Sequence, residues 1–286
     1  MNPLATHPLI YDLHSHTTAS DGLLTPSELV LRAVNNEVNV LAITDHDTVN
    51  GLAEAHQTIL AHKLPLHLVN GVEISTNWQS YSNIHIVGLN IDPTNEHLLA
   101  LLKKQGYYRI ERALQISEKL NKVSIPNAYE QAKVFAKGDI VSRSHFARFL
   151  VEKGYAKDLK RAFKKYLGKS GYAYVSSKWP PIETAIEAIH QANGIAVLAH
   201  PTRYDLTLTK LRSLIEYFKA CNGDGIEVSQ SRQTLEDLAL LTKYAKQYQL
   251  LASQGSDFHD FTSYLDLGKT QALSNNLTPV WHNWLL

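Results

Sequence analysis

Histidines and carboxylates directly follow several short apolar runs of this sequence. Imidazole nitrogens and carboxylate oxygens bind divalent first-row metal ions, and strand ends are rigid supports that can direct several side chains at one point. No single fragment is specific, but together they predict a metal cluster. The fragments are Tyr11–His16, Thr44–Asp47, Gly71–Glu73, Ile84–Gly88, Ala199–Pro201 and Gly255–His259.

The pair His14 and His16 is the first candidate. Side chains two residues apart in a strand point to the same face, so both rings can reach one ion. A His-x-His pair alone is weak evidence, because the histidine content predicts about 0.7 such pairs by chance. Asp21 follows in the turn Ser20–Gly22, which can fold its carboxylate back towards the two rings. The alternative is a histidine pair that only forms hydrogen bonds in a loop.

His46 lies directly after a second apolar run, between Asp45 and Asp47. We expect His46 to bind metal and Asp45 to orient an imidazole from outside the coordination sphere. Asp47 and Thr48 can at the same time cap the helix that follows.

Glu73 ends a third apolar run, where an unpaired carboxylate would cost several kcal/mol to bury. A metal ion removes that cost, and one carboxylate can bridge two ions; the alternative is a salt-bridged glutamate. His85 alternates with Ile84 and Ile86, so it faces away from the side that they bury. The alternative for His85 is a ring that faces solvent.

Three further candidates follow the last strands. Pro201 is expected to keep the backbone of His200 extended. Asp257 and His259 are again two residues apart, in a stretch that we expect to be extended. The alternative for all three is a polar loop that closes a barrel.

Composition limits the classes of protein. Hydrophobic residues make up 44% of 286 residues, enough for one large α/β domain with a smaller module. A net charge of +1 favours neither a general nucleic-acid binder nor a membrane-surface protein, although a local basic patch remains open. The single cysteine, Cys221, excludes an internal disulfide and a thiolate zinc site. Without a signal-peptide pattern or a membrane-length apolar run, we expect a cytoplasmic protein.

Strand and helix patterns alternate on both sides of a helical middle segment, which favours a mostly parallel sheet or barrel. The strand patterns cover 9–13, 38–44, 66–74, 83–91, 195–199, 225–228 and 250–253. The first helix pattern begins at Thr25, with Glu28 at the capping-box position. Four further helix patterns cover 49–62, 181–191, 209–220 and 234–248. The middle is rich in lysine and arginine, and we predict a helical insertion at 99–175 within a barrel formed by 1–98 and 176–286.

The order of the motifs resembles the PHP (polymerase and histidinol phosphatase) superfamily. In this sequence they read H-x-H and S-D-G, then T-D-H-D, G-x-E, I-H-x-x-G, H-P and D-x-H. The stretches DLHSHTTASDGLLTPSELV, VSRSHFARFLVEKGY, AHPTRYDL and ASQGSDFHD are similar to one branch, the bacterial 3′,5′-nucleoside bisphosphate phosphatases, also described as 5′→3′ exoribonucleases of the RNase AM type. The resemblance spans the whole chain.

The resemblance implies a distorted (β/α)7 barrel, similar to a TIM barrel, with an inserted small helical domain and three divalent metal ions. It assigns His14, His16, Glu73 and Asp257 to the first ion, Glu73, His85 and His200 to the second, and Asp21, His46 and His259 to the third. A ligand set without thiolates makes Mn²⁺ the first choice, with Fe²⁺ or Zn²⁺ as alternatives.

The expected reaction is hydrolysis of a phosphate ester. Two ions bridged by Glu73 would share a hydroxide whose pKa falls from about 15.7 towards 7, and this hydroxide would attack phosphorus. The ions would neutralise the charge that develops. We expect Glu73, Asp257 and His200 to be the catalytic residues.

A second phosphate on the substrate requires a cationic contact. Arg143 and His145 lie at a predicted helix start, where a guanidinium fork and free amides can bind a 5′-phosphate. Arg203, three residues after His200, is another candidate. The alternative for both arginines is a salt bridge at a domain interface.

Two activities are expected at this one site. The first is removal of the 3′-phosphate from nucleoside 3′,5′-bisphosphates such as pAp. The second is 5′→3′ trimming of short 5′-monophosphorylated RNA. A basic groove at Lys157–Lys165 would favour RNA as the substrate. The alternatives are a histidinol-phosphate-type phosphatase and a non-enzymatic polymerase-accessory module. We expect no membrane partner and no obligate protein partner.

Overall fold

Seven strands form one sheet in chain order in the computed structural model, which describes residues 9–138, 140–261 and 265–284. Four neighbouring pairs are parallel, and β4 is antiparallel to both of its neighbours. The strands are β1 (Tyr11–Asp12), β2 (Val40–Ile43), β3 (His67–Trp78), β4 (Tyr81–Leu89), β5 (Ile195–Leu198), β6 (Gly225–Gln230) and β7 (Leu251–Gly255).

The sheet closes at the ends of β1 and β7. The backbone N–H of Leu13 donates to the carbonyl of Gln254 (3.0 Å), and the N–H of Asp257 donates to the carbonyl of His14 (2.8 Å). His16 donates from its N–H to the carbonyl of Phe258 (2.8 Å). This closure places His14 and His16 beside Asp257, although more than 240 residues separate them in the chain. The predicted barrel is confirmed.

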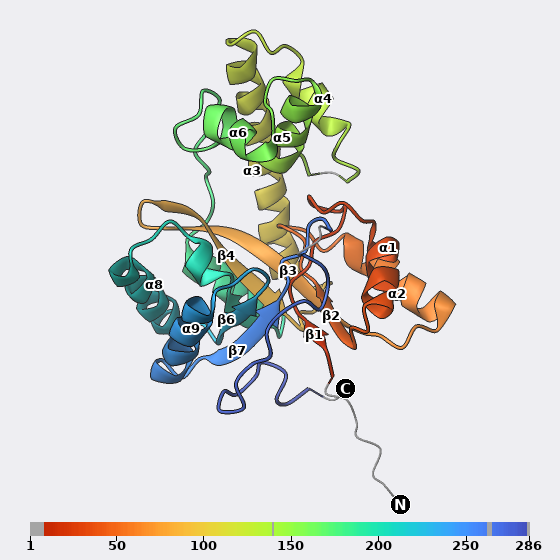
Figure 1. Ribbon diagram of the computed structural model, residues 1–286, viewed down its shortest axis with the longest axis vertical. Helices are drawn as coiled ribbons and strands as arrows, with labels where there is room; N and C mark the ends of the chain where they lie inside the picture. Colours follow the sequence, from red (N-terminus) through yellow and green to blue (C-terminus); the bar gives the residue numbers. More distant parts are fainter. Residues whose placement is uncertain (1–8, 139, 262–264, 285–286) are drawn as a thin grey trace, which may run out of the picture.

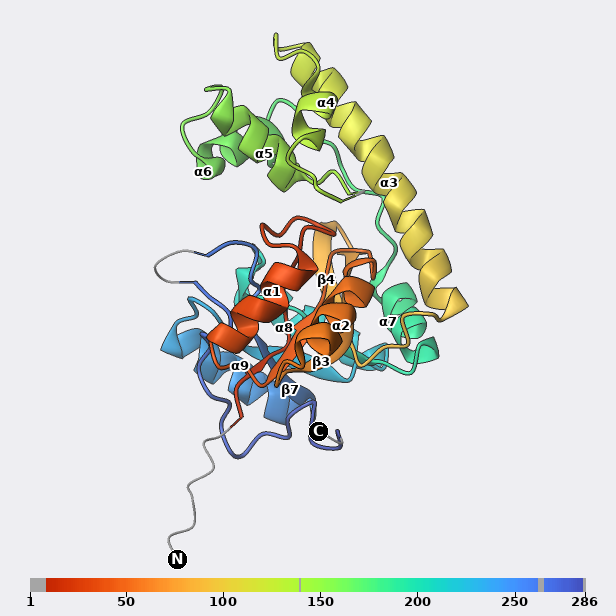
Figure 2. The same cartoon turned by 90° about the vertical axis from the view of Figure 1, so that its right-hand side faces the viewer.

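Five helices accompany the barrel strands: α1 (Pro26–Asn35), α2 (Gly51–His62), α8 (Leu208–Ala220) and α9 (Leu235–Gln247), labelled in Figure 1, and α7 (Ile182–Gln191), labelled in Figure 2. The predicted start of α1 is confirmed, because Thr25 and Glu28 form a capping box. One β/α unit is incomplete, since β3 and β4 are joined by Gln79 and Ser80 alone, as a hairpin. The expected cap of α2 is wrong: Asn50 is its N-cap and makes no side-chain hydrogen bond there.

The segment between β4 and α7 extends away from the barrel (Figure 2). It contains α3 (Glu96–Asn121), α4 (Ala128–Lys133), α5 (Arg143–Glu152), α6 (Leu159–Ala162) and the π-helix η1 (Phe163–Leu167). Leu98 and Leu102 at the start of α3 belong to the barrel core, whereas Ile116 and Leu120 belong to the insertion's own core. The long helix α3 therefore joins the two cores, and the exact division at 98 and 176 stays a prediction.

A turn of the barrel is fixed to α3 by a buried ion pair. The carboxylate of Asp47 pairs with Arg109 and also accepts from Gln105 Nε2 (3.1 Å) and from the N–H of Ser75 (2.8 Å). This contact replaces the predicted capping role of Asp47.

No described helix is long and apolar enough to cross a membrane.

Candidate metal centre and adjoining cavity

Glu73 lies at the centre of the histidine cluster and is fully buried. Its Oε1 is 2.9 Å from Nδ1 of His85 and 3.0 Å from Nε2 of His200, and its Oε2 is 2.7 Å from Nδ1 of His46. Glu73 was expected at a strand end, but β3 continues for five further residues to Trp78. Its carboxylate therefore projects from a rigid strand interior and faces three rings at once.

His14 and His16 approach Glu73 from the end of β1. The Nε2 of His14 is 3.4 Å from Glu73 Oε1, and the Nε2 of His16 is 3.4 Å from Oε2. Asp257 Oδ1 lies 3.4 Å from His14 Nε2 and 3.2 Å from His16 Nε2. The Nε2 atoms of His14 and His16 therefore lie close to both Glu73 oxygens and to Asp257 Oδ1, which gives two nitrogen and three oxygen donors in one place.

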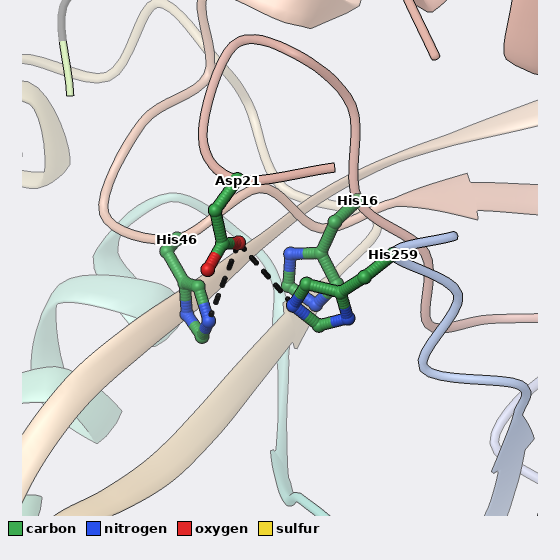
Figure 3. A group of neighbouring side chains, drawn as sticks. All are labelled: His16, Asp21, His46 and His259. Atoms are coloured by element: carbon green, nitrogen blue, oxygen red, sulfur yellow. Dashed lines mark ion pairs between the residues drawn. The ribbon is translucent and has the colours of Figure 1, made fainter. Parts of the chain in front are cut away.

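A third group forms around Asp21, as Figure 3 shows. Its Oδ1 is 3.2 Å from Nε2 of His259 and 3.9 Å from Nε2 of His46. The ring of His16 stacks on His259 with centroids 4.0 Å apart. All nine predicted ligands therefore meet in one cluster. How they divide among ions stays a prediction, because His16 and His46 each belong to two of the possible ligand groups.

Several buried polar atoms of the cluster are suited to a metal. Asp21 Oδ1, Glu73 Oε2 and His46 Nδ1 make no well-aligned hydrogen bond with a described residue, although each lies within ion-pair distance of another group of the cluster. A buried carboxylate oxygen without a donor is costly, and a divalent cation removes that cost. The donor set of imidazole and carboxylate groups without thiolates suits Mn²⁺, Fe²⁺ or Zn²⁺. The residues present thus fit metal ions.

The protonation states of Glu73 and His16 suit metal binding. Burial raises the pKa of the Glu73 carboxyl, but His85, His46 and His14 outweigh it and hold that pKa well below its ordinary value. Burial and the neighbouring His259 lower the pKa of His16 to about 3, so its imidazole is neutral at pH 7. An ionised carboxylate beside a neutral imidazole is the state that binds a metal.

Two ligands have an unusual backbone conformation. His200 has φ 30° and ψ 57°, and Asp257 has φ 54°, so both lie in the left-handed region. The expectation of an extended backbone at these positions is wrong. At His200 a tertiary contact supports this backbone conformation, because the His200 N–H donates to Glu227 Oε2 at 2.6 Å. Such strain in non-glycine residues concentrates at functional sites.

Glu227 is a functional residue that the sequence analysis missed. It lies on β6, is 2% exposed and places Oε1 2.9 Å from Nδ1 of His14. The available signal was a carboxylate between the apolar residues Ile226 and Val228, similar to the signal at Glu73, which follows an apolar run.

Asp45 has a different role from the one expected. Its carboxylate accepts from the N–H of Thr17 (2.7 Å), from the hydroxyl of Thr17 (2.6 Å) and from the hydroxyl of Ser20 (2.6 Å). Asp45 therefore holds the turn that carries Asp21, rather than an imidazole ring.

A cavity of about 180 Å³ lies between the cluster and the insertion. Asp21, His46, His85 and His259 line it on the barrel side. The residues that line it from the insertion and its connections include Arg109, Arg112, Ser142, Arg143, Ser144, Phe163 and Trp179. Metal ligands and arginines thus face the same small space.

The charges of Arg112 and Arg143 are not balanced by carboxylates of the described residues, none of which forms an ion pair with either. Burial, together with repulsion from Arg143 and Arg109, lowers the pKa of Arg112 to about 9, so it stays protonated at neutral pH. Burial also lowers the pKa of Arg143. Two partly buried guanidinium groups that form no ion pair with a described carboxylate favour an anionic ligand.

The three residues predicted to contact the substrate, Arg143, His145 and Arg203, lie in different places. Arg143 lines the cavity, and its guanidinium lies 5.9 Å from the ring of Phe163. His145 is 1% exposed, is not among the residues that line the cavity, and accepts the N–H of Ser142 at Nδ1 (3.1 Å). Arg203 pairs with Asp257 and lines a separate cavity of about 340 Å³. Their contacts with substrate stay predictions, which the geometry supports best for Arg143.

The start of α5 is hydrogen-bonded to Asp21, one of the predicted metal ligands. Ser144 donates its hydroxyl to Asp21 Oδ2 at 2.9 Å, and Arg148 donates to the Asp21 carbonyl at 3.0 Å. The sequence analysis identified this helix start but missed its link to Asp21 and the contribution of Arg112.

Comparison with known proteins agrees with this geometry. The family model described as PHP domain matches residues 12–197. A 5′-3′ exoribonuclease of Haemophilus influenzae is 48% identical, over 96% of this chain and 98% of its own length. A 3′,5′-nucleoside bisphosphate phosphatase of Chromobacterium violaceum is 40% identical, over 94% of each chain. The solved structure of an amidohydrolase from that organism, with bound sulfate and no metal, has a TM-score of 0.89 at 40% identity and covers 95% of this chain and 94% of its own.

Proposed function

The chain belongs to the PHP domain family, and from this premise we propose that it is a metal-dependent phosphoesterase for nucleotides with a 5′-phosphate. It removes the 3′-phosphate of nucleoside 3′,5′-bisphosphates and shortens 5′-monophosphorylated RNA in the 5′→3′ direction. One observation carries the proposal: residues of the ligand cluster line the same cavity as Arg112 and Arg143, which form no ion pair with a described carboxylate.

The cluster would hold three divalent cations, with Mn²⁺ as the first choice and Fe²⁺ or Zn²⁺ as alternatives. When bound, such ions lower the pKa of water and neutralise charge on a phosphoryl group. Glu73 is the residue placed to serve more than one ion, because its two oxygens face different rings. His200 faces Glu73 directly, and Asp257 faces His14 and His16.

The remaining residues of the cavity bind and orient the substrate. Arg143 and Arg112 provide the positive charge that a 5′-phosphate needs, and they line the same cavity as residues of the cluster. Phe163 and Trp179 provide aromatic surface for the base or the sugar. Holding the substrate at both ends fixes the scissile ester against the cluster.

One site can serve both activities, because a bisphosphate is the one-nucleotide limit of a 5′-phosphorylated chain. Relatives with each of the two activities in their names align over nearly the whole length of this chain. A histidinol-phosphate-type substrate fits less well, since its ammonium group would meet the buried arginines. The complete cluster also argues against a purely accessory role.

The test is release of phosphate and nucleotide from three substrates with Mn²⁺ present: pAp, AMP, and a 5′-phosphorylated RNA of five nucleotides. We expect phosphate from pAp and stepwise shortening of the RNA, with no release from AMP. Turnover of pAp alone would restrict the function to small nucleotides. No turnover of any substrate would refute the proposal.

A further inference from the structure

A second cavity lies beside the ligand cluster, at the carboxyl ends of the parallel strands β5, β6 and β7. Its volume is about 340 Å³, and the residues that line it include Arg203, Gln230, Arg232 and Asp257. Ligand sites of barrel folds lie at this end of the strands, and such cavities typically measure about 300–1,000 Å³. The second cavity therefore has the position and the size of a ligand site.

Asp257 faces both the cluster and the second cavity. Its Oδ1 is 3.4 Å from Nε2 of His14 and 3.2 Å from Nε2 of His16, whereas its Oδ2 pairs with Arg203. Arg203 lines the second cavity and also donates to the carbonyl of Ser231 at 3.2 Å. The second cavity thus borders the cluster through a single predicted ligand.

The first cavity, of about 180 Å³, meets the cluster at an adjacent point. His259 lines the first cavity, and its Nδ1 is 3.5 Å from Oδ1 of Asp257, which lines the second. Of the residues that the structure describes, none lines both cavities. The side chains of His259 and Asp257 are 30% and 12% exposed. A chain that passes from one cavity to the other across this contact therefore lies against the cluster.

The lining of the second cavity suits an uncharged polar group. Gln230, the last residue of β6, is 2% exposed, and its Nε2 makes no hydrogen bond with a described residue. A buried amide donor without a partner is costly, and an oxygen or ring nitrogen of a ligand removes that cost. The charges of Arg203 and Arg232 are opposed by those of Asp237 and Asp257. Balanced charges of this kind fit a nucleoside better than a group of phosphates.

We propose that the second cavity binds the second nucleoside of a 5′-phosphorylated RNA. The inference rests on the proposed function, which places the first nucleotide in the first cavity and the phosphate that joins the two nucleotides at the cluster. In hydrolysis, a water oxygen bonds to phosphorus, the P–O3′ bond breaks and O3′ takes a proton. The phosphate therefore stays on the 5′ end of the remaining chain, and its nucleoside lies beyond the cluster.

Two residues divide the binding of the remaining chain. The amide of Gln230 donates to the second nucleoside, and Arg232, which is exposed, contacts the phosphate that follows it. A nucleoside bisphosphate has no second nucleoside, so it leaves the second cavity empty. This cavity thus contributes to the binding of RNA and not to the binding of pAp.

The first experiment compares Gln230→Met with wild type in the Mn²⁺-loaded protein. The two ligands are the dinucleotide pApA and the bisphosphate pAp, each with a methylene group in place of the 3′ oxygen, so that neither is hydrolysed. We expect the Kd of the dinucleotide to rise about fivefold, the effect of one neutral hydrogen bond. The Kd of the bisphosphate should stay the same. Calorimetric titration measures both, and Gln191→Met, at the exposed end of α7, is the matched control.

The second experiment uses Arg232→Gln, a change at an exposed position. We expect weaker binding of the corresponding trinucleotide analogue, with a slope of log affinity against log salt that is shallower by about 0.7 for the one lost phosphate contact. Binding of the dinucleotide analogue should not change. Arg212→Gln, which removes the same charge from α8, is the matched control.

Because these ligands bind without turnover, the outcomes separate this inference from the proposed function. An unchanged dinucleotide Kd in Gln230→Met overturns the inference, even where wild type hydrolyses pAp. Equal weakening of both ligands overturns it too, since Gln230 would then support the site as a whole. If Gln230→Met does not fold, Arg232→Gln decides: a salt slope equal to that of wild type or of Arg212→Gln overturns the inference. If wild type hydrolyses neither pAp nor RNA, yet Gln230→Met weakens only the dinucleotide, the second cavity stands and the proposed activity fails.

Discussion

The carboxylate of Glu227 lies 2.9 Å from Nδ1 of His14, while the other ring nitrogen of His14 faces Glu73. When Nδ1–H donates to Glu227, the lone pair of Nε2 points into the cluster, which is the tautomer that binds a metal. The second oxygen of Glu227 accepts the N–H of His200. One buried carboxylate outside the cluster therefore positions two of its ligands.

Replacing Glu227 by glutamine is expected to weaken metal binding by about 10- to 100-fold, because the amide is a poorer acceptor for the His14 ring. Titration of the metal-free protein with Mn²⁺ measures the affinity. Glu236→Gln, at an exposed position in the first turn of α9, is the control and should bind as wild type does. An unchanged affinity in Glu227→Gln would contradict the positioning role.

Glu73→Ala is expected to abolish turnover and to remove the stabilisation that Mn²⁺ gives the folded protein. A ligand that binds only the native state stabilises it by about 2.7 kcal/mol at 100 times its Kd. Thermal unfolding with and without Mn²⁺ should therefore show a rise in Tm for wild type and little or none for the variant. Retained turnover in Glu73→Ala would refute a mechanism that depends on a bridging carboxylate.

The cluster could be predicted because each ligand has a local signal, a polar residue that follows or interrupts an apolar run. The contact between Glu227 and His14 has no such signal, since 213 residues separate the two and only closure of the barrel brings them together. Asp47 is a similar case. Its sequence neighbours predict a helix cap, but its actual partner, Arg109, comes from a helix 62 residues later. Tertiary contacts of this kind override local preference.

The conformations of His200 and Asp257 were also beyond prediction from the sequence. Both have positive φ, although neither is glycine or asparagine. A fold stabilises such a backbone only through the contacts around it, such as the hydrogen bond from the N–H of His200 to Glu227. Pro201 alone predicts the opposite conformation.

Arg143→Ala and Arg112→Ala are each expected to raise the KM for pAp by about tenfold or more. Each change would remove a charge-assisted contact that we propose to the 5′-phosphate, and such hydrogen bonds contribute about 1.5–3 kcal/mol. Steady-state kinetics with pAp and with adenosine 3′-monophosphate measure the effect. The substrate without a 5′-phosphate should be affected much less, because it makes no such contact.

Arg212→Ala is the control for these variants, since Arg212 lies exposed on α8, where its Nε is 3.7 Å from Glu216. Equal losses on both substrates would assign Arg112 and Arg143 to the structure of the cavity rather than to the 5′-phosphate. An unchanged KM for pAp in Arg143→Ala would show that this arginine does not contact the substrate.

His145 is expected to make the protein less stable as the pH falls. Burial lowers the pKa of His145 to about 4, and its Nδ1 accepts the N–H of Ser142 in the capping box of α5. In the unfolded chain the pKa is about 6.5, so between these values the unfolded state binds the extra proton. The contribution of neutral His145 to the free energy of unfolding is complete above pH 6.5. It is lost as the pH falls towards 4, by about 3 kcal/mol over the whole window at about 1.4 kcal/mol per pH unit.

In His145→Gln the amide oxygen can still cap the helix but does not titrate. Urea unfolding of the metal-free proteins at pH 7, 6, 5 and 4 should therefore show a steeper loss for wild type than for the variant, and parallel curves would contradict the role of His145.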